Sequence, residues 1–194
     1  MNPDITIRAI RHGEEETVCG VVKRSFDLHV GQEYSPEGVA EFYRYANSVA
    51  MASRLTADHF VLVAEHQNHL VGMIEFRNNQ HLSMLFVDPP YFRKGVSRSL
   101  FGQALGIIMR ANPGADRITV NSSRYAVPVY QSFGFITSGP ERTINGIIFI
   151  PMHFFFRLSC WLVGRDSRRD AFGRPPALPL NSDVSQQRRE GRNP

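Results

Sequence analysis

Residues 82–105, LSMLFVDPPYFRKGVSRSLFGQAL, decide the fold that we expect for this chain. The LSMLFV segment is nearly all apolar, which is typical of a strand buried on both faces of a sheet. A Pro-Pro pair ends the strand, and a helix with one apolar face begins at Gly95. The first N–H groups of a helix lack intrahelical partners and attract anions, and Arg93 and Lys94 add two cations here. The segment would suit a pyrophosphate, although a single glycine also fits an ordinary turn between a strand and a helix.

The remaining sequence alternates between strand and helix patterns. Ser35 and Pro36 are typical of a helix start, and the residue pairs at 67–68 and 78–79 are typical of turns between strands. This order predicts an α/β fold with a mixed sheet and helices on both of its faces. The period of the apolar residues predicts helices at 14–30, 35–54, 95–110 and 126–133, and strands at 5–10, 60–66, 70–76, 82–87, 117–121, 135–136 and 144–155.

The net charge of +4 belongs to one end of the chain. Residues 1–156 hold 14 basic and 14 acidic side chains, whereas residues 157–194 hold eight arginines and four acidic side chains. We therefore expect one folded domain over residues 1–156 and an Arg- and Pro-rich tail over residues 157–194 that is largely disordered. A neutral domain argues against a nucleic-acid partner for the folded part. The tail alone is a candidate for contact with nucleic acid or acidic lipid.

The cysteines and the apolar segments bear on the cellular location. Cys19 and Cys160 are too few for a disulfide framework or a metal set, which favours a reducing compartment. The N-terminus has no apolar segment of signal-peptide length. Residues 147–164 are largely apolar, but Arg157 in the middle of a membrane span would cost about 2.5–3.5 kcal/mol. We expect no transmembrane span and a cytoplasmic location.

Residues 82–105 resemble the central motif of the GNAT acyltransferases, the superfamily of acetyl-CoA-dependent N-acetyltransferases. In that family a strand of the form apolar-x-Val-x-Pro precedes a loop of the form (Gln/Arg)-x-x-Gly-x-(Gly/Ala), whose amides hold the CoA pyrophosphate. Residues 85–89 match the strand, and residues 92–97 occupy the loop with Phe92 in place of Gln or Arg and Ser97 in place of Gly or Ala. The resemblance implies that the cofactor-binding residues are Leu85, Phe86, Val87, Phe92, Arg93, Lys94, Gly95, Val96 and Ser97.

Residues 117–135, RITVNSSRYAVPVYQSFGF, are similar to the following strand and helix of the family, which end in a Tyr followed by a Gly-Phe pair. This resemblance implies that Tyr130 protonates the departing CoA thiolate, and a phenol with a pKa of about 10 carries the proton at neutral pH. A buried core tyrosine is the alternative. By the same resemblance, Asn121 or Ser123 contacts the pantetheine arm of the cofactor, although Asn121 also suits a local turn bond.

The resemblance covers residues 5–154 and implies both a fold and a reaction. The fold is a mixed, mostly antiparallel central sheet of six to seven strands flanked by helices on both faces. The reaction is direct attack of a primary amine, from a small molecule or from a protein or peptide, on acetyl-CoA in a ternary complex, with no metal. The backbone N–H groups of Phe86 and Val87 would polarise the thioester carbonyl. The alternative is a GNAT-like module that binds CoA with weak or no catalysis.

An alkylammonium has a pKa of about 10, so the reaction needs a base. We expect Glu75 or His81 to take that role. The alternatives are that each is a solvated strand residue, or that a chain of water molecules carries the proton. The family's acceptor-selecting helices correspond to residues 29–45, whose carboxylates would suit a cationic amine. Residues 154–156 are either core or the surface of a homodimer.

Overall fold

The structure is a computed structural model that describes residues 4–156 of the chain. The predicted tail, residues 157–194, lies outside this range, and its disorder stays a prediction. The helical segments are α1 (Glu15–His29), η1 (Gly31–Glu33), α2 (Pro36–Tyr45), α3 (Ser48–Leu55), η2 (Pro89–Tyr91), α4 (Val96–Ala111) and α5 (Val127–Phe133). The strands are β1 (Ile5–Ala9), β2 (His59–His66), β3 (His69–Arg77), β4 (His81–Val87), β5 (Arg117–Ser122), β6 (Ile136–Thr137), β7 (Arg142–Ile144) and β8 (Ile147–Phe155).

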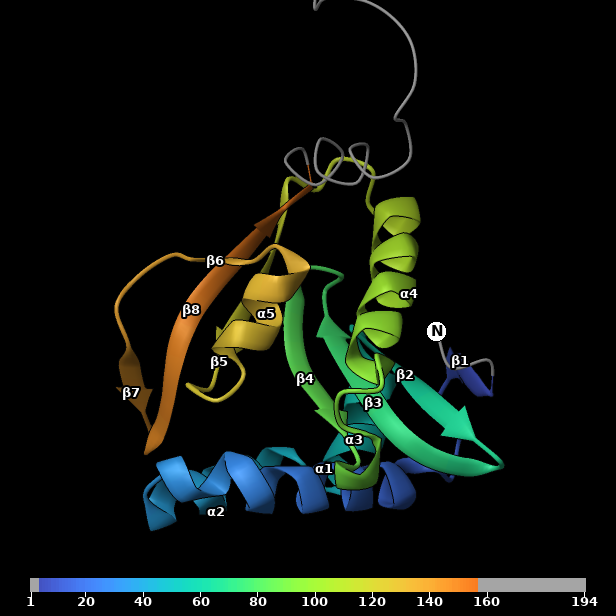
Figure 1. Ribbon diagram of the computed structural model, residues 1–194, viewed down its shortest axis with the longest axis horizontal. Helices are drawn as coiled ribbons and strands as arrows, with labels where there is room; N and C mark the ends of the chain where they lie inside the picture. Colours follow the sequence, from blue (N-terminus) through green and yellow to red (C-terminus); the bar gives the residue numbers. More distant parts are fainter. Residues whose placement is uncertain (1–3, 157–194) are drawn as a thin grey trace, which may run out of the picture.

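The eight strands of the described range form one sheet with helices on both faces (Figure 1). The strand order is β1-β2-β3-β4-β5-β8-β6, and β7 pairs with β8. Within this range all pairs are antiparallel except β4 with β5, which is parallel. The predicted mixed and mostly antiparallel fold is confirmed, and β7 is a strand beyond the six to seven expected.

The predicted strand at residues 144–155 is a hairpin in the structure. β7 and β8 are joined by a turn at Asn145 and Gly146, which have φ angles of 49° and 75°. An Asn-Gly pair is a strong signal for such a turn, because both turn positions need a positive φ. The predicted turns at 67–68 and 78–79 are confirmed, and their residues also have positive φ angles.

The predicted single helix at residues 35–54 is two helices, α2 and α3. Asn47 has an extended backbone, with φ of −121° and ψ of 161°, and its side chain accepts the N–H of Ala50 at 2.9 Å. An asparagine in this position ends one helix and caps the next, because its short side chain replaces a backbone acceptor. The predicted cap at Ser35 is confirmed, since its hydroxyl accepts the N–H of Gly38 at 3.2 Å.

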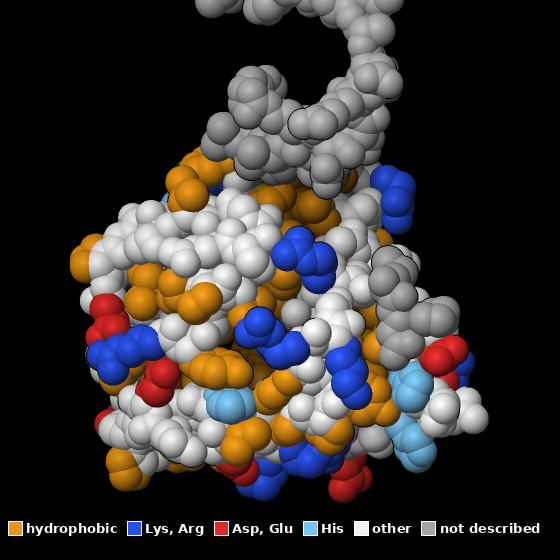
Figure 2. Space-filling view, in the orientation of Figure 1, with side chains coloured by type: hydrophobic (Ala, Val, Ile, Leu, Met, Phe, Trp, Pro, Cys, Tyr) orange, Lys and Arg blue, Asp and Glu red, His pale blue; other side chains and the backbone are white. Residues whose placement is uncertain are grey.

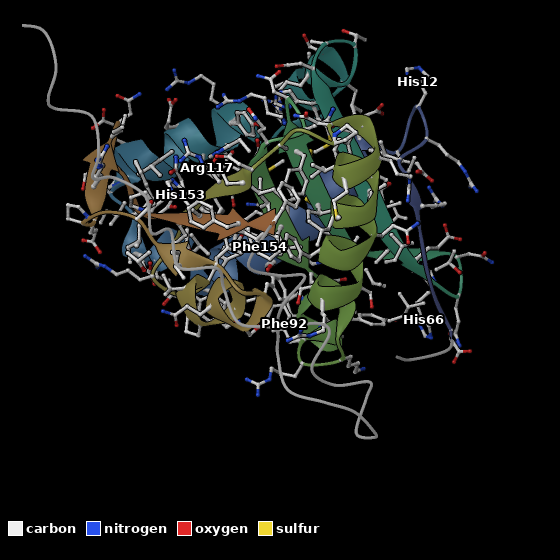
Figure 3. All side chains as sticks on the ribbon, turned by 90° about the horizontal axis from the view of Figure 1, so that it is seen from above. His12, His66, Phe92, Arg117, His153 and Phe154 are labelled. Carbon is white, nitrogen blue, oxygen red and sulfur yellow. The ribbon has the colours of Figure 1, made fainter. Side chains whose placement is uncertain are left out.

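Two hydrophobic cores cover the two faces of the sheet. One core packs α4 and α5 on the strands and includes Leu82 and Phe154. The other packs α1 and α3 on the opposite face and includes Met51 and Met73. Figure 3 shows Phe154 within the molecule, so this part of the candidate dimer surface is core. Among residues 4–156, no helix is long and apolar enough to cross a membrane.

Candidate active site

The parallel strands β4 and β5 lie side by side only where they begin. They pair at His81 with Thr119 and at Leu82 with Val120, and they then diverge. Only part of β4 is buried, contrary to the sequence-based prediction. The reason is that, beyond Leu82, one edge of β4 borders a gap instead of another strand.

A β-bulge at Ser83 sets the direction of the backbone along this gap. β4 pairs with β3 at Leu82 with Phe76 and at Met84 with Glu75, so Ser83 has no residue opposite. Leu82 and Met84 consequently pack into the cores on opposite faces of the sheet, although they are two residues apart. Such an insertion re-aims the side chains and amides that follow it.

The amides of Leu85 and Val87 point into the gap. The N–H of Asp88 donates to the carbonyl of Val71 in β3 at 2.8 Å. Successive N–H groups of a strand alternate between its two edges, so the N–H of Phe86 points to β3, and its two neighbours point away from β3. The amides of Phe86 and Val87 were predicted to polarise the thioester carbonyl. The amide of Val87 does border the gap, but the amide of Phe86 does not, and the second amide at the gap is that of Leu85.

A pocket of about 900 Å³ occupies the gap and brings together most residues predicted from the sequence. On the face shown in Figure 2, hydrophobic side chains lie in a hollow with Lys and Arg side chains beside it. The predicted cofactor and catalytic residues Lys94 and Glu75 do not line the pocket. Those that do are His81, Leu85, Phe86, Val87, Phe92, Arg93, Gly95, Val96, Ser97, Asn121, Ser123 and Tyr130.

The loop from η2 to α4 turns sharply through two residues with positive φ. Arg93 has a φ of 61°, and Gly95, directly before α4, has a φ of 81°. The amides of the first turn of α4, at Val96 and Ser97, therefore lie at the pocket without intrahelical acceptors. The ammonium of Lys94 instead lies 4.9 Å from the centre of the Tyr91 ring.

Two side-chain contacts with α1 and β2 hold this loop in place. Arg24 in α1 donates two hydrogen bonds to the carboxylate of Asp88, at 2.8 and 2.9 Å. Nδ1 of His66, at the end of β2, lies 2.9 Å from the hydroxyl of Tyr91. Both ends of η2 are thus tied to the scaffold, which fixes where the loop meets the pocket.

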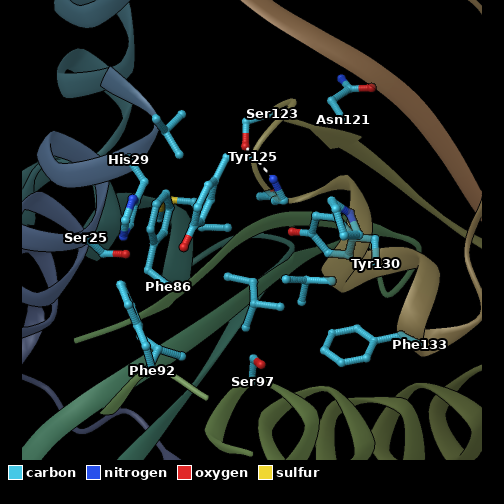
Figure 4. Close-up of a pocket in the computed structure, with 18 of the residues that line it drawn as sticks. Ser25, His29, Phe86, Phe92, Ser97, Asn121, Ser123, Tyr125, Tyr130 and Phe133 are labelled. Carbon is cyan, nitrogen blue, oxygen red and sulfur yellow. Dashed lines mark hydrogen bonds between the residues drawn. The ribbon is translucent and has the colours of Figure 1, made fainter. Parts of the chain in front are cut away.

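Tyr130 lies on α5, and its hydroxyl faces the pocket (Figure 4). Gly134, with a φ of 101°, ends α5, and the N–H of Phe135 donates to the carbonyl of Tyr130 at 3.0 Å. The ring packs edge-on against Phe133 and Phe135. Burial raises the pKa of Tyr130 well above its usual value, so the phenol keeps its proton at neutral pH. Tyr130 is both a core residue and a pocket residue.

Asn121 and Ser123 both border the pocket but differ in their surroundings. Ser123 is buried, and its hydroxyl accepts the N–H of Ala126 at 3.3 Å, which stabilises the turn before α5 (Figure 4). Asn121 is exposed and pairs with Pro151 of β8. Ser123 therefore has a structural bond as well as a place in the pocket, whereas Asn121 lies at the rim.

Glu75 lies in the core beside α3, away from the pocket. Its side chain is 0% exposed. Nε of Arg54 lies 2.8 Å from Oε1 and Nη2 lies 3.2 Å from Oε2, while Nδ1 of His59 lies 2.8 Å from Oε1. The guanidinium of Arg54 also lies 3.7 Å from the centre of the Tyr45 ring. Both oxygens of the carboxylate are therefore occupied.

His81 lines the pocket at the start of β4. Its Nδ1 lies 2.7 Å from Oγ1 of Thr119. Burial lowers the pKa of His81 to about 4, and the charge of Arg77 acts in the same direction. The imidazole is therefore neutral at pH 7 and has a lone pair available to accept a proton.

An aromatic contact that the sequence did not predict lies within the pocket. His29, at the end of α1, stacks on Tyr125 with ring centres 4.3 Å apart and planes at 7°. The ring of Phe92 lies 5.2 Å from that of His29. All three residues line the pocket, so α1, the loop after η2 and the segment after β5 meet there. No local pattern marks this contact, because its members are far apart in the sequence.

The predicted acceptor segment, residues 29–45, faces the pocket only in part. Tyr34, Glu41 and Tyr45 line the pocket, and Glu41 forms an ion pair with Arg44. The pocket therefore receives fewer carboxylates from this segment than the sequence suggested. The charged and aromatic residues of the segment that do not line it are Glu33, Glu37, Tyr43 and Arg44.

Comparison with known proteins identifies the family of this chain. A model of the acetyltransferase (GNAT) domain matches residues 30–155. The chain belongs to the GNAT acetyltransferase family. YafP of Escherichia coli (strain K12), an uncharacterized N-acetyltransferase, is 27% identical over 139 residues, which cover 72% of this GNAT chain and 86% of YafP.

Solved structures share the fold of this GNAT domain. The GCN5-related N-acetyltransferase from Rhodopseudomonas palustris matches with a TM-score of 0.67 and 21% identity, over 78% of this chain and 95% of that one. The PaiA N-acetyltransferase from Thermoplasma acidophilum, solved in complex with coenzyme A, matches with a TM-score of 0.63 and 20% identity. The match covers 78% of this chain and 99% of the PaiA chain. Within residues 4–156, no three His, Cys, Asp or Glu side chains are grouped so as to hold a metal ion.

Proposed function

We propose that this GNAT domain is an N-acetyltransferase that moves an acetyl group from acetyl-CoA to a primary amine by direct attack in a ternary complex. The observation that carries the proposal is the gap between β4 and β5, where the amides of Leu85 and Val87 and the hydroxyl of Tyr130 border one pocket. Acyl transfer needs donors where negative charge develops and an acid for the leaving group. The Thermoplasma relative solved with coenzyme A supports the choice of cofactor.

The loop at residues 92–97 has the chemistry to hold the CoA pyrophosphate. Amides at the start of α4 and the guanidinium of Arg93 suit a doubly charged anion. Ser97 stands in place of the family's Gly or Ala and adds a hydroxyl to the side chain of Ala, or a hydroxymethyl group to Gly. Phe92, in place of Gln or Arg, removes a polar contact and packs near His29 instead. We propose that Lys94 contributes charge from outside the pocket.

Leu85, Val87 and Tyr130 supply the acyl-transfer groups in this proposal. The two amides would donate to the thioester carbonyl, where they stabilise the charge that develops during attack. The Tyr130 hydroxyl would give its proton to the departing thiolate. The raised pKa of Tyr130 keeps the proton on the hydroxyl at neutral pH, so the group is available to hydrogen-bond to the sulfur while negative charge develops there.

His81 is the proposed end of the proton path from the amine. It lies four residues before Leu85 on β4, which corresponds to about 13 Å along a strand. Because of this separation, we propose that water molecules beside Ser83 and Tyr45 relay the proton to Nε2. We assign Glu75 a structural role, because Arg54 and His59 occupy its oxygens.

Release of free thiol from acetyl-CoA in the presence of a panel of primary amines tests the proposal. We expect turnover with at least one amine, and Tyr130→Phe should lower kcat by about 100- to 10,000-fold while acetyl-CoA still binds. Tyr43→Phe is the matched control, because Tyr43 lies outside the pocket and should leave kcat unchanged. Binding of acetyl-CoA without turnover on any amine would favour the alternative, a CoA-binding module with weak or no catalysis.

The cytoplasmic location, the homodimer and the lack of a nucleic-acid partner stay predictions. The small number of cysteines supports the first of these. Size-exclusion chromatography with light scattering would test the second, and a nucleic-acid shift assay would test the third.

A further inference from the structure

A second, polar hollow adjoins the main pocket at the end where β4 begins. Its volume is about 290 Å³, and it shares Arg77 and His81 with the main pocket. Arg77 and His81 therefore form part of the wall of both hollows. The remaining residues of this hollow, which we call the Arg77 hollow, are Asn78, Gln80, Asp116, Arg117 and Thr119.

The Arg77 hollow holds two guanidinium groups without partners. Within residues 4–156, neither Arg77 nor Arg117 makes an ion pair or a side-chain hydrogen bond. Arg24 and Arg54, in contrast, are paired, Arg24 with the carboxylate of Asp88 and Arg54 with that of Glu75. Figure 3 shows Arg117 at the end of the sheet where β5 begins.

The nearby carboxylates do not neutralise this charge. Glu75 is occupied by Arg54 and His59, and Glu41 is paired with Arg44. Asp116 alone adds a negative charge to the Arg77 hollow. Burial is the main cause of the lowered pKa of His81, and the positive charge of Arg77 lowers it further.

A positive hollow selects against a plain polyamine and for an amine that also carries an anion. An ammonium group beside Arg77 and Arg117 would be repelled, whereas a carboxylate would receive two charge-assisted contacts. Specificity of this kind combines attraction for one acceptor class with repulsion of another.

Strand geometry sets the distance between the anion and the reacting amine. Leu85, whose amide borders the proposed thioester site, lies four residues after His81, which is at most about 13 Å along β4 because of the bulge at Ser83. An α-amino acid is far too short to span it. An extended peptide of three residues spans about 10 Å, and the long side chains of Arg77 and Arg117 can cover the remainder.

We propose that the acceptor is a peptide-like primary amine whose carboxylate, about three residues from the reactive nitrogen, binds Arg77 and Arg117. The inference rests on the proposed function, whose pocket supplies the amine end. The carboxylate can be a C-terminus or an Asp or Glu side chain of a longer peptide.

The test compares a tripeptide with a free C-terminus, the same tripeptide as its C-terminal amide, and a hexapeptide amide with Asp at position three. Thiol release and calorimetric binding to the CoA-loaded full chain are both measured. We expect amidation of the tripeptide to lower kcat/KM and affinity by about 10- to 100-fold. Equal use of acid and amide by both readouts would overturn the proposal. Preference for the Asp hexapeptide over the tripeptide acid would assign the carboxylate to a side chain.

Variants decide whether the Arg77 hollow is responsible. Arg77→Gln and Arg117→Gln should each remove most of the preference for the acid, with the KM for acetyl-CoA unchanged. Arg110→Gln, an exposed arginine of α4 outside both hollows, should keep the preference. Equal loss for the acid and the amide in Arg77→Gln would contradict the proposal. Carboxylate-dependent binding without turnover would uphold the acceptor class while the proposed function fails.

Discussion

Glu75 and His81, the two side chains expected to act as bases, lie on neighbouring strands in opposite kinds of environment. Glu75 is sealed in the core, and Arg54 and His59 bind its carboxylate. His81 borders the pocket, with a partner for Nδ1, Thr119, and within residues 4–156 none for Nε2. A buried ionisable group whose hydrogen-bonding capacity is filled can stabilise the fold, whereas one with an open nitrogen can exchange protons.

The largest expected effect would come from Glu75→Gln. Removing the charge leaves Arg54 and His59 without their counter-ion, and breaking a buried pair in this way costs about 3–5 kcal/mol of unfolding free energy. Urea denaturation measures this loss, and we expect kcat of the folded variant to stay close to that of the unaltered protein. Glu141→Gln, which breaks an exposed pair with Arg124, should leave stability nearly unchanged. A large fall in kcat with stability intact would instead identify Glu75 as the base and contradict its structural role.

His81→Gln should change how the free energy of unfolding depends on pH below neutrality. The folded pKa of about 4 is below the ordinary value, so the unfolded chain binds the proton first as the pH falls. Stability should therefore decline between about pH 6.5 and pH 4, by up to about 3 kcal/mol, and the variant should lack this part of the decline. Urea midpoints across this range measure it. His12→Gln, with a side chain 99% exposed, should keep the decline. Identical slopes in all three proteins would show that His81 is not held neutral.

Gly38→Ala tests the close packing of the wall of the pocket. A Cβ on Gly38 would overlap the carbonyl of Gly146, because the start of α2 packs directly on the turn between β7 and β8. We expect a cost of about 1–3 kcal/mol and a raised KM for the acceptor, since Ile147 beside this contact lines the pocket. Gly102→Ala, in an open part of α4, should be neutral or stabilising. An unchanged melting temperature for Gly38→Ala would contradict the close contact.

The smallest effect is expected from Tyr125→Ala. The ring is 47% exposed and stacks on His29, and such a pair contributes about 0.5–1.5 kcal/mol. Its loss should speed the dissociation of acetyl-CoA several-fold, as measured by stopped-flow competition, with little change in stability. Tyr125→Phe keeps the stack and should behave like the unaltered protein. Equal rates for the alanine and phenylalanine variants would leave the stack without a role in cofactor retention.

Local sequence signals predicted the elements of the fold better than they predicted the site. Turns such as 67–68 follow from residues that tolerate positive φ, and Asn145-Gly146 carries the same signal although it was assigned to a strand. The break at Asn47 was missed because an asparagine within a helical pattern is not by itself a stop signal. The partners of Glu75, in contrast, come from α3 and β2, and only tertiary packing brings them to β3. The family motif indicated the loop that we propose to hold the cofactor, but it did not indicate the base.

The most direct measurement is a crystal structure of the full chain with acetyl-CoA bound. We predict the thioester carbonyl within hydrogen-bonding distance of the amide of Leu85 or Val87, the Tyr130 hydroxyl beside the sulfur, and the pyrophosphate on the amides at Val96 and Ser97. Glu75 should keep its partners unchanged. A cofactor bound outside the gap between β4 and β5, or a thioester more than 6 Å from the Tyr130 hydroxyl, about twice a hydrogen-bond length, would contradict the account.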